Sequence, residues 1–252
     1  MTDFARTIVI DSRYSGPPGL GNGGYVAGVV AAALGAEATV TLRAPIPLDT
    51  PLELAGNGGR DASANTIARG TRRTELRSGD SLLAEGVAGT PDLPSPPAVP
   101  ERSTALAASG RYAGRTPNPY EQCFVCGFTR TPGSALRVFA GPTPTPGLVA
   151  ADWPVHPDLA DEDGAVPDEY LWGALDCPGA YAVGIIDLRL GRMTARISGR
   201  VRPGERCTVA GWRLGAERRK HFTGTAVYGE AGDVVALAHS IWIAPRADGT
   251  SP

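Results

Sequence analysis

Lysine is almost absent from this sequence: Lys220 is the only one, and arginine carries nearly all the positive charge. An excess of arginine and alanine is typical of a GC-rich bacterial genome, so we treat this bias as a sign of origin and not of function. The formal net charge of the 252 residues is −2. A charge this close to zero argues against a nucleic-acid-binding protein.

We expect neither a signal peptide nor a membrane span. Residues 1–6 have neither the charged start nor the apolar core of a signal peptide. No run of about 20 apolar residues occurs, so we expect no membrane span. The four cysteines are too few for a disulfide scaffold in a chain of this length. We therefore expect a cytoplasmic protein with free thiols.

Turn-forming residues are abundant: 33 glycines and 23 prolines argue against a mainly helical protein. The most distinctive stretch is the glycine-rich segment 21–28, which passes into the apolar run 29–34. This pattern predicts a loop that turns into a buried helix over residues 24–35. The N–H groups at a helix start are unpaired, and they can hold a phosphate, a carboxylate or a developing oxyanion.

Strand-like segments surround this helix, which suggests an antiparallel meander. We expect the strands at residues 7–13, 39–43, 51–54, 65–77 and 81–88. Five prolines between residues 91 and 100 then indicate a linker. The polar, mixed residues that follow, up to residue 120, are expected to cross the surface.

A second unit of the same kind follows. Its helix is expected over residues 168–182, where Pro178 can kink it or end it early. Its strands are expected at residues 135–139, 148–153, 192–201, 207–214, 221–228 and 234–243. Three short matches occur in the same order in both units, which favours an internal duplication. They pair residues 25–28 with 170–173, 54–56 with 209–211, and 77–80 with 230–233.

A buried helix wrapped by an antiparallel meander, occurring twice, resembles the hotdog fold, and the tandem arrangement resembles the double-hotdog proteins. The resemblance implies an α+β fold in which the sheets of the two halves join edge to edge. The two hotdog units would be residues 1–92 and 121–247, with a linker at 93–120 and a tail at 248–252.

The first half also resembles the phenylacetate-pathway type of acyl-CoA thioesterase. That group carries an Asn before a His-Gly-Gly at the start of the central helix. Here Gly23 and Gly24 supply the glycine pair, but Asn22 stands where the His would be. The sequence therefore departs from the motif at the residue whose side chain could act in the reaction.

Asp176 is the most informative single residue, because it lies in the apolar segment 171–177 of the second predicted helix. Burial of an unpaired carboxylate is costly. In hotdog thioesterases the helix start of one unit polarises the thioester carbonyl, and the helix of the other supplies the carboxylate. The resemblance implies one composite site, in which Gly23 and Gly24 polarise the carbonyl and Asp176 activates water. The alternative is a structural Asp176 that acts as a cap or pairs with an arginine.

The repeat places Ala31 opposite Asp176, so the mirror site would join Ala31 to the acidic helix start at residues 168–169 and be inactive. Asn22 has two interpretations, as a holder of the attacking water or the carbonyl and as a helix cap. The basic cluster 218–220 either grips a coenzyme A phosphate or forms a solvated hairpin. The candidate substrate contacts are Tyr25, His156, Arg218, Arg219 and Lys220.

Cys123 and Cys126 form a C-x-x-C motif with three alternatives: a zinc site, a redox pair or two buried thiols. A structural zinc needs four ligands, and Cys177 and Cys207 have no matching spacing. We therefore favour buried thiols and expect no metal and no cofactor.

Three functions compete: hydrolysis of an acyl thioester, hydration or dehydration of one, and non-catalytic acyl binding. Hotdog hydratases usually rely on a catalytic His, and neither predicted central helix contains one, which favours hydrolysis. The expected partner is a thioester of coenzyme A or of an acyl carrier protein. We expect neither nucleic acid nor membrane as a partner, and a homo-oligomer of double-hotdog chains is an open alternative to the single chain.

Overall fold

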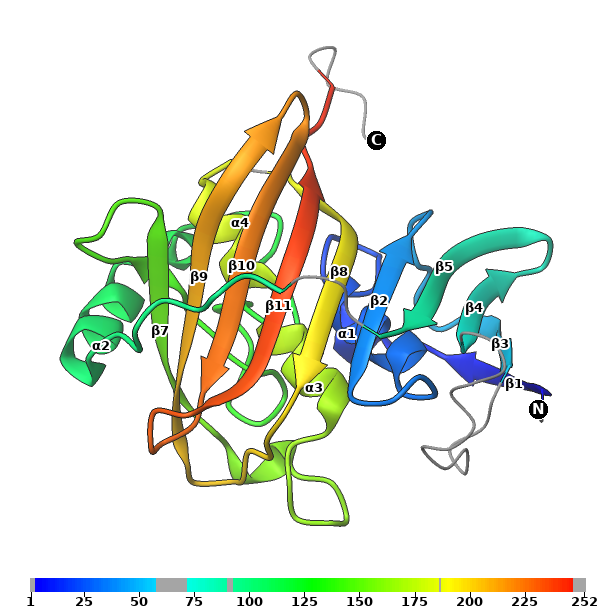
Figure 1. The fold of residues 1–252 in the computed structure, drawn as a ribbon, viewed down its shortest axis with the longest axis horizontal. Helices are drawn as coiled ribbons and strands as arrows, with labels where there is room; N and C mark the ends of the chain where they lie inside the picture. The colour runs from blue at the N-terminus through cyan, green and yellow to red at the C-terminus, as the bar shows by residue number, and fades with distance from the viewer. Residues whose placement is uncertain (1–2, 58–71, 90–92, 186, 247–252) are drawn as a thin grey trace.

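The computed structural model describes residues 3–57, 72–89, 93–185 and 187–246. Its main element is one antiparallel sheet of eleven described strands, with helices α1, α3 and α4 packed on one face (Figure 1). The first half contains β1 (Asp3–Val9), α1 (Gly23–Ala31), β2 (Glu37–Leu42), β3 (Pro51–Asn57), β4 (Arg73–Ser78) and β5 (Ser81–Ala88). After α2 (Arg102–Gly110), the second half contains β6 (Gly141–Pro142), β7 (Leu148–Pro154), α3 (Asp168–Ala174), α4 (Cys177–Val183), β8 (Arg189–Ile197), β9 (Arg206–Glu217), β10 (Lys220–Tyr228) and β11 (Val234–Ile243).

The two halves have the same topology. The sheet order is β1-β3-β4-β5-β2-β8-β11-β10-β9-β7-β6, so β1-β3-β4-β5-β2 of the first half corresponds to β7-β9-β10-β11-β8 of the second. The repeated residues 54–56 and 209–211 lie in the equivalent strands β3 and β9. The repeated segments 77–80 and 230–233 lie at the equivalent β4–β5 and β10–β11 turns. The predicted plan of two similar units is confirmed.

The halves join through β2 and β8. These strands pair antiparallel, with Ala38 opposite Ala195 and Thr39 opposite Thr194. The Thr39 and Thr194 hydroxyls lie 3.0 Å apart and hydrogen-bond across the seam. Because every strand at this seam pairs on both sides, the two units share one continuous sheet, as predicted.

Helix α1 runs through the core and contacts α3. Nearly all of its residues are buried, as expected for a helix that is apolar on every side. Glycines allow the two helices to approach closely. A Cβ on Gly24 would lie 2.5 Å from the Asp176 Cβ, and one on Gly28 would lie 2.5 Å from the Glu169 Cα.

The predicted second helix, 168–182, is two helices. α3 ends at Ala174 and α4 begins at Cys177, with Asp176 between them at φ −79° and ψ −80°. Pro178 is the cause, because proline has no N–H to donate to Ala174 and its ring would clash with that carbonyl. Asp176 is therefore at a helix junction and not inside a helix.

The predicted strand at residues 135–139 is not formed. The Leu136 and Val138 amides donate to the carbonyls of Phe124 and Val125, 2.9 Å away in each case, and not to a strand of the sheet. This segment thus packs on the loop that carries Cys123 and Cys126. The first strand also differs from prediction: β1 starts at Asp3 and ends at Val9, and a 3-10 turn follows at Ser12–Tyr14.

The proline-rich segment after β5 crosses the outer face of the second half (Figure 1). The Tyr228 hydroxyl donates to the Pro97 carbonyl at 2.7 Å and attaches the segment to β10. Helix α2 follows, with Ala105 and Ala108 buried against Ala150 of β7. The predicted linker, 93–120, therefore contains a packed helix. Residues 65–71 of a predicted strand, residues 91–92 and the predicted tail 248–252 lie outside the described residues.

Among the described residues, no helix has both the length and the apolar character needed to span a membrane.

Candidate active site

Asp176 is brought from the second half onto the start of α1 in the first half. Its side chain is only 4% exposed. The Oδ2 atom accepts one hydrogen bond from the Asn22 Nδ2 at 2.8 Å and another from the Gly24 backbone N–H at 3.0 Å. The chain separates Asn22 from Asp176 by 154 residues. A buried carboxylate thus accepts from a helix-start N–H that has no partner within the helix. The start of a helix is a position that favours negative charge.

Asn22 uses both ends of its amide. Its Oδ1 accepts from the Tyr25 N–H at 2.9 Å, which caps α1, while its Nδ2 donates to Asp176. The cap interpretation of Asn22 therefore describes a contact that the side chain makes, whereas a role in holding the attacking water or the carbonyl stays a prediction. The side chain is 2% exposed, so neither contact competes with solvent.

Burial dominates the electrostatics of Asp176. Loss of solvent raises its pKa to about 7, against the lowering effect of the Gly24 N–H and the Asn22 amide. The second carboxylate oxygen, Oδ1, is buried and has no hydrogen-bond partner among the described residues. One oxygen is thus held in place and the other keeps its lone pairs, which is the arrangement a general base needs.

The Gly23 N–H is the other donor at this helix start. As the first residue of α1 it has no intrahelical partner, and no partner for it occurs among the described residues. Gly23 lies on the cavity wall beside Asn22 and Asp176. The Gly24 N–H, by contrast, is engaged by Asp176.

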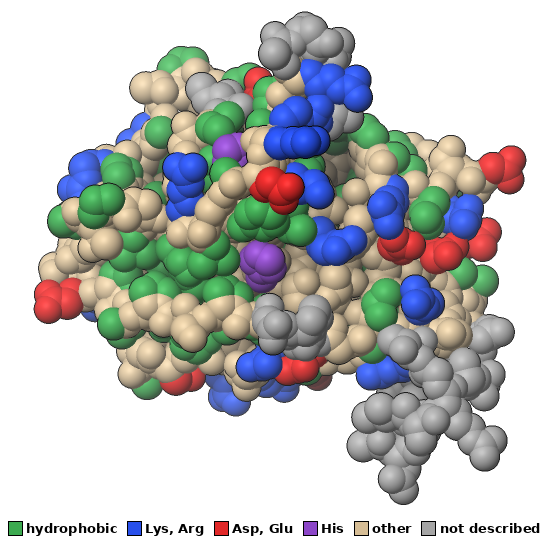
Figure 2. All heavy atoms as spheres, turned by 45° about the horizontal axis from the view of Figure 1, so that its top comes forward, with side chains coloured by type: hydrophobic (Ala, Val, Ile, Leu, Met, Phe, Trp, Pro, Cys, Tyr) green, Lys and Arg blue, Asp and Glu red, His purple; other side chains and the backbone are tan. Residues whose placement is uncertain are grey.

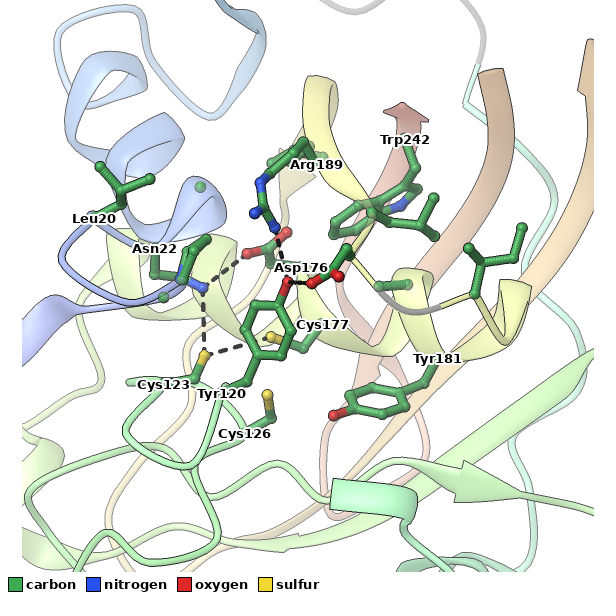
Figure 3. A pocket seen from close by; sticks show the side chains of 18 of the residues that line it. Leu20, Asn22, Tyr120, Cys123, Cys126, Asp176, Cys177, Tyr181, Arg189 and Trp242 are labelled. Carbon is green, nitrogen blue, oxygen red and sulfur yellow. Dashed lines mark hydrogen bonds between the residues drawn. The ribbon is translucent and has the colours of Figure 1, made fainter. Parts of the chain in front are cut away.

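A cavity of about 840 Å³ opens against these groups. Most of its wall is apolar, as in sites for small molecules with an apolar portion. Its apolar side chains include Leu20, Leu42, Ile46, Leu188, Leu190 and Trp242. Figure 3 shows that Asn22 and Asp176 point toward one another from opposite halves, beside the cysteines on the cavity wall.

A second polar group lies on the same wall. The Arg189 guanidinium donates to the Tyr120 hydroxyl at 2.7 Å, and that hydroxyl donates to the Asp187 carboxylate at 2.8 Å (Figure 3). All three residues line the cavity. They place a cation and an anion next to the apolar wall.

Comparison with known proteins identifies the fold. No protein-family model matches the sequence, and no curated protein matches it. Solved structures do match. A provisionally assigned thioesterase from Novosphingobium aromaticivorans is 15% identical, with a TM-score of 0.65 and 96% of both chains covered. A protein of unknown function with a hot dog fold, from Alicyclobacillus acidocaldarius, is 13% identical, with a TM-score of 0.61 over 97% of this chain and 94% of the other.

The chain is a double hotdog. Acyl-CoA thioesterase II TesB2 from Mycobacterium marinum also matches, at 13% identity and a TM-score of 0.55 over 85% of this chain and 81% of the other. Each comparison extends across both halves, so the likeness concerns the tandem arrangement as well as the single hotdog unit.

The double hotdog brings four of the predicted site residues together: Asn22, Gly23 and Gly24 from the first unit and Asp176 from the second. Tyr25 is adjacent in the chain, but its ring stacks on Tyr14 with centroids 3.9 Å apart and does not line the cavity. Its aromatic neighbours explain this placement, since the ring is buried among Tyr14, Phe124 and Tyr170.

The other predicted substrate contacts lie outside the cavity wall. His156 caps the 3-10 turn Pro157–Leu159 and lies 3.7 Å from the Asp158 carboxylate. Arg218 and Arg219 form the turn between β9 and β10, and Lys220 begins β10; Lys and Arg side chains gather at the surface there (Figure 2). Lys220 pairs along the ladder with Ile243, and Ile243 does line the cavity. The β9–β10 hairpin is thus joined to the cavity wall through the pairing of β10 with β11. Its role toward coenzyme A stays a prediction.

Two groups at the site were not predicted from the sequence: Arg189 with Tyr120 and Asp187, and a cluster of three cysteines. Cys177, which follows Asp176, lies against Cys123 and Cys126, and the sulfur atoms of all three lie within 4.8 Å of one another. The C-x-x-C motif was a signal for two of them. No spacing rule connects the third, because the fold brings it from a different segment.

Proposed function

We propose that this double hotdog hydrolyses acyl thioesters of coenzyme A or of an acyl carrier protein at one composite site between its units. The observation that carries the proposal is the buried Asp176 carboxylate of one unit, hydrogen-bonded to the helix start of the other, on the wall of an apolar cavity. The named thioesterases among the matching structures support the same reaction class. A cytoplasmic location and assembly into a homo-oligomer stay predictions.

In the proposed reaction Asp176 is the general base. Its free Oδ1 takes a proton from water, and the water oxygen attacks the thioester carbonyl carbon. The Gly23 N–H is placed to polarise the carbonyl oxygen and to stabilise its developing charge. Asn22 and the Gly24 N–H hold Oδ2, so the carboxylate keeps its orientation. The C–S bond then breaks, the proton held by Asp176 passes to the sulfur, and the products are the free thiol and a carboxylic acid.

The acyl group would occupy the apolar part of the cavity. Leu42, Ile46 and Leu190 supply wall surface beside Gly23. The space of about 840 Å³ is at the large end for a ligand site. The cation of Arg189 is on the same wall and is available to the polar part of the substrate.

We propose a single site per chain. In the mirror position the C-terminal part of α1 carries the buried Ala31 where the second half has Asp176. There, Gly28 packs directly on Glu169, with no room for a Cβ. Without a carboxylate at the position of Ala31, this side lacks the proposed base.

Hydration or dehydration is the less favoured function because the described cavity wall contains no histidine. Hydratases and dehydratases of the hotdog fold are expected to use a catalytic histidine. Non-catalytic acyl binding is the remaining alternative, and an activity measurement distinguishes it from hydrolysis.

The test is to incubate the purified protein with a panel of acyl-CoAs and to measure the released thiol. We expect hydrolysis of at least one member, and a loss of about 10²–10⁴-fold in kcat for Asp176→Asn. The free energy of unfolding should be unchanged or higher, because the amide oxygen can accept both donors and a buried charge is removed.

Asp168→Asn is the matched control, since it removes an exposed carboxylate at the start of α3 and should leave turnover unchanged. Equal activity of wild type and Asp176→Asn would show that Asp176 is structural. An acyl-CoA that binds tightly and releases no thiol would favour the binding function.

A further inference from the structure

Three cysteine sulfurs lie close together on the wall of the cavity. Cys123 and Cys126 come from a loop before the second hotdog sheet, and Cys177 is the first residue of α4. The three sulfur atoms lie within 4.8 Å of one another, and the Cys123 and Cys177 sulfurs are 3.7 Å apart. Figure 3 shows the three side chains turned toward one another beneath Asn22.

This spacing fits ligands of one tetrahedral metal ion. Zinc–thiolate bonds are about 2.3 Å long, which puts two sulfurs of one tetrahedron about 3.8 Å apart. A disulfide would use two of the three sulfurs and leave the third unpaired in the interior. A metal ion uses all three.

The loop that carries two of the cysteines is built to hold them. The Gly127 N–H donates to the Cys123 carbonyl at 2.8 Å, and a Cβ on Gly127 would lie 2.5 Å from that oxygen. Only glycine therefore fits directly after Cys126 in this tight turn. The Tyr112 hydroxyl donates to the Cys126 carbonyl at 2.7 Å, and the Phe124 N–H donates to the Ser15 carbonyl at 2.7 Å. The backbone of the loop is thus held in place at both cysteines.

A hydrogen-bond donor also points at the group. The Asn22 Nδ2 lies 3.8 Å from the Cys123 sulfur and donates to it. Metal ligands of this kind must be deprotonated.

We propose that Cys123, Cys126 and Cys177 bind one soft divalent metal ion of the zinc class, with its fourth position open to the cavity. The open position follows from two observations. All three cysteines line the cavity, and no imidazole or carboxylate of the described residues joins their group. Three protein ligands and one exchangeable position are the pattern of zinc sites that contact a ligand or substrate. Binding releases three thiol protons and leaves a site with one net negative charge.

This site would be independent of the thioesterase proposal, because metal binding is measured without any substrate. It would also place a metal–thiolate group with one net negative charge next to Asp176, the residue that precedes Cys177 in the chain. Thiolates favour zinc over magnesium or calcium, so selectivity is expected from ligand type alone.

The test is to incubate the purified, reduced full chain with zinc, dialyse it and measure bound metal by elemental analysis. We expect one zinc per chain in the wild type and loss of that zinc in Cys126→Ser. Cys207→Ser is the matched control, because Cys207 is also buried but lies in β9, outside the group. It should keep the zinc.

Cobalt(II) on the wild type provides a readout that needs no variant, and so remains decisive if Cys126→Ser does not fold. We expect thiolate-to-cobalt charge-transfer absorption of an intensity that indicates three thiolates. Absence of stoichiometric zinc in the wild type, or equal zinc in wild type and Cys126→Ser, would overturn the proposal. A disulfide that removes two of the four free thiols would overturn it as well.

Discussion

At the scale of the residue, Asn22 connects the helix to the carboxylate. Its Oδ1 caps α1 through the Tyr25 N–H, and its Nδ2 donates to Asp176. A primary amide is the neutral side chain that has an acceptor and a donor on the same carbon. This explains why a residue that is typical of a helix cap also belongs to the site.

Two substitutions at Asn22 separate these contacts. Asn22→Ser keeps a cap acceptor but loses the amide N–H that donates to Asp176, so we expect the cap to be retained and kcat/KM to be clearly lower. Asn22→Ala loses both and should also cost about 0.5–2 kcal/mol of unfolding free energy. Urea unfolding and thiol release measure the two effects. A fully active Asn22→Ser variant would show that the donor to Asp176 is not needed.

At the scale of the element, the close crossing of α1 and α3 positions the site. The crossing depends on glycine, because a Cβ on Gly24 would lie 2.7 Å from the Trp172 carbonyl oxygen as well as 2.5 Å from the Asp176 Cβ. The first of these neighbours is backbone, so it cannot rotate away. The helices would have to separate.

We expect Gly24→Ala to lower both stability and turnover. The overpacking costs about 1–3 kcal/mol, which exceeds the gain of up to about 1 kcal/mol from replacing glycine in a helix. Gly110→Ala in α2 is the control, since a Cβ there meets nothing within 4 Å. It should be neutral or slightly stabilising. Thermal unfolding and thiol release measure both variants, and a Gly24→Ala protein as stable as wild type would contradict the close crossing.

At the scale of the molecule, the two hotdog units behave as one body in their packing. A single core cluster contains side chains of both, from Leu54 of β3 to Trp153 of β7, and β2–β8 pairing continues the sheet. All four tryptophans lie in the second half, at positions 153, 172, 212 and 242. Tryptophan fluorescence therefore reports on the second unit, whereas circular dichroism reports on both.

We expect both probes to show one unfolding transition with the same midpoint. Leu54→Ala, in the first unit, should lower that midpoint in the fluorescence trace as well, because emptying this buried site costs about 2–5 kcal/mol. Leu106→Ala is the control, since that side chain is 57% exposed. Two separate transitions, or a fluorescence midpoint that Leu54→Ala leaves unchanged, would show that the units unfold independently.

The sequence by itself determined the features whose signals are local. The glycine-rich start of α1, the apolar helix behind it and the strands β8–β11 follow from neighbouring residues. The repeated turns at residues 77–80 and 230–233 were enough to indicate two units of one plan. The break beside Pro178 was also visible, because the missing N–H acts within one turn of the helix.

Only the tertiary structure decided the pairings between distant segments. Asn22 meets Asp176 across 154 residues, and Cys177 meets Cys123 across 54. Packing of α1 on α3 sets the first of these pairings, and it depends on many weak contacts that no short stretch of sequence contains. The same holds for residues 135–139. Their composition is typical of a strand, but their amides donate to the loop that carries Cys123 and Cys126. Local propensity is a small term, and burial against a partner outweighs it.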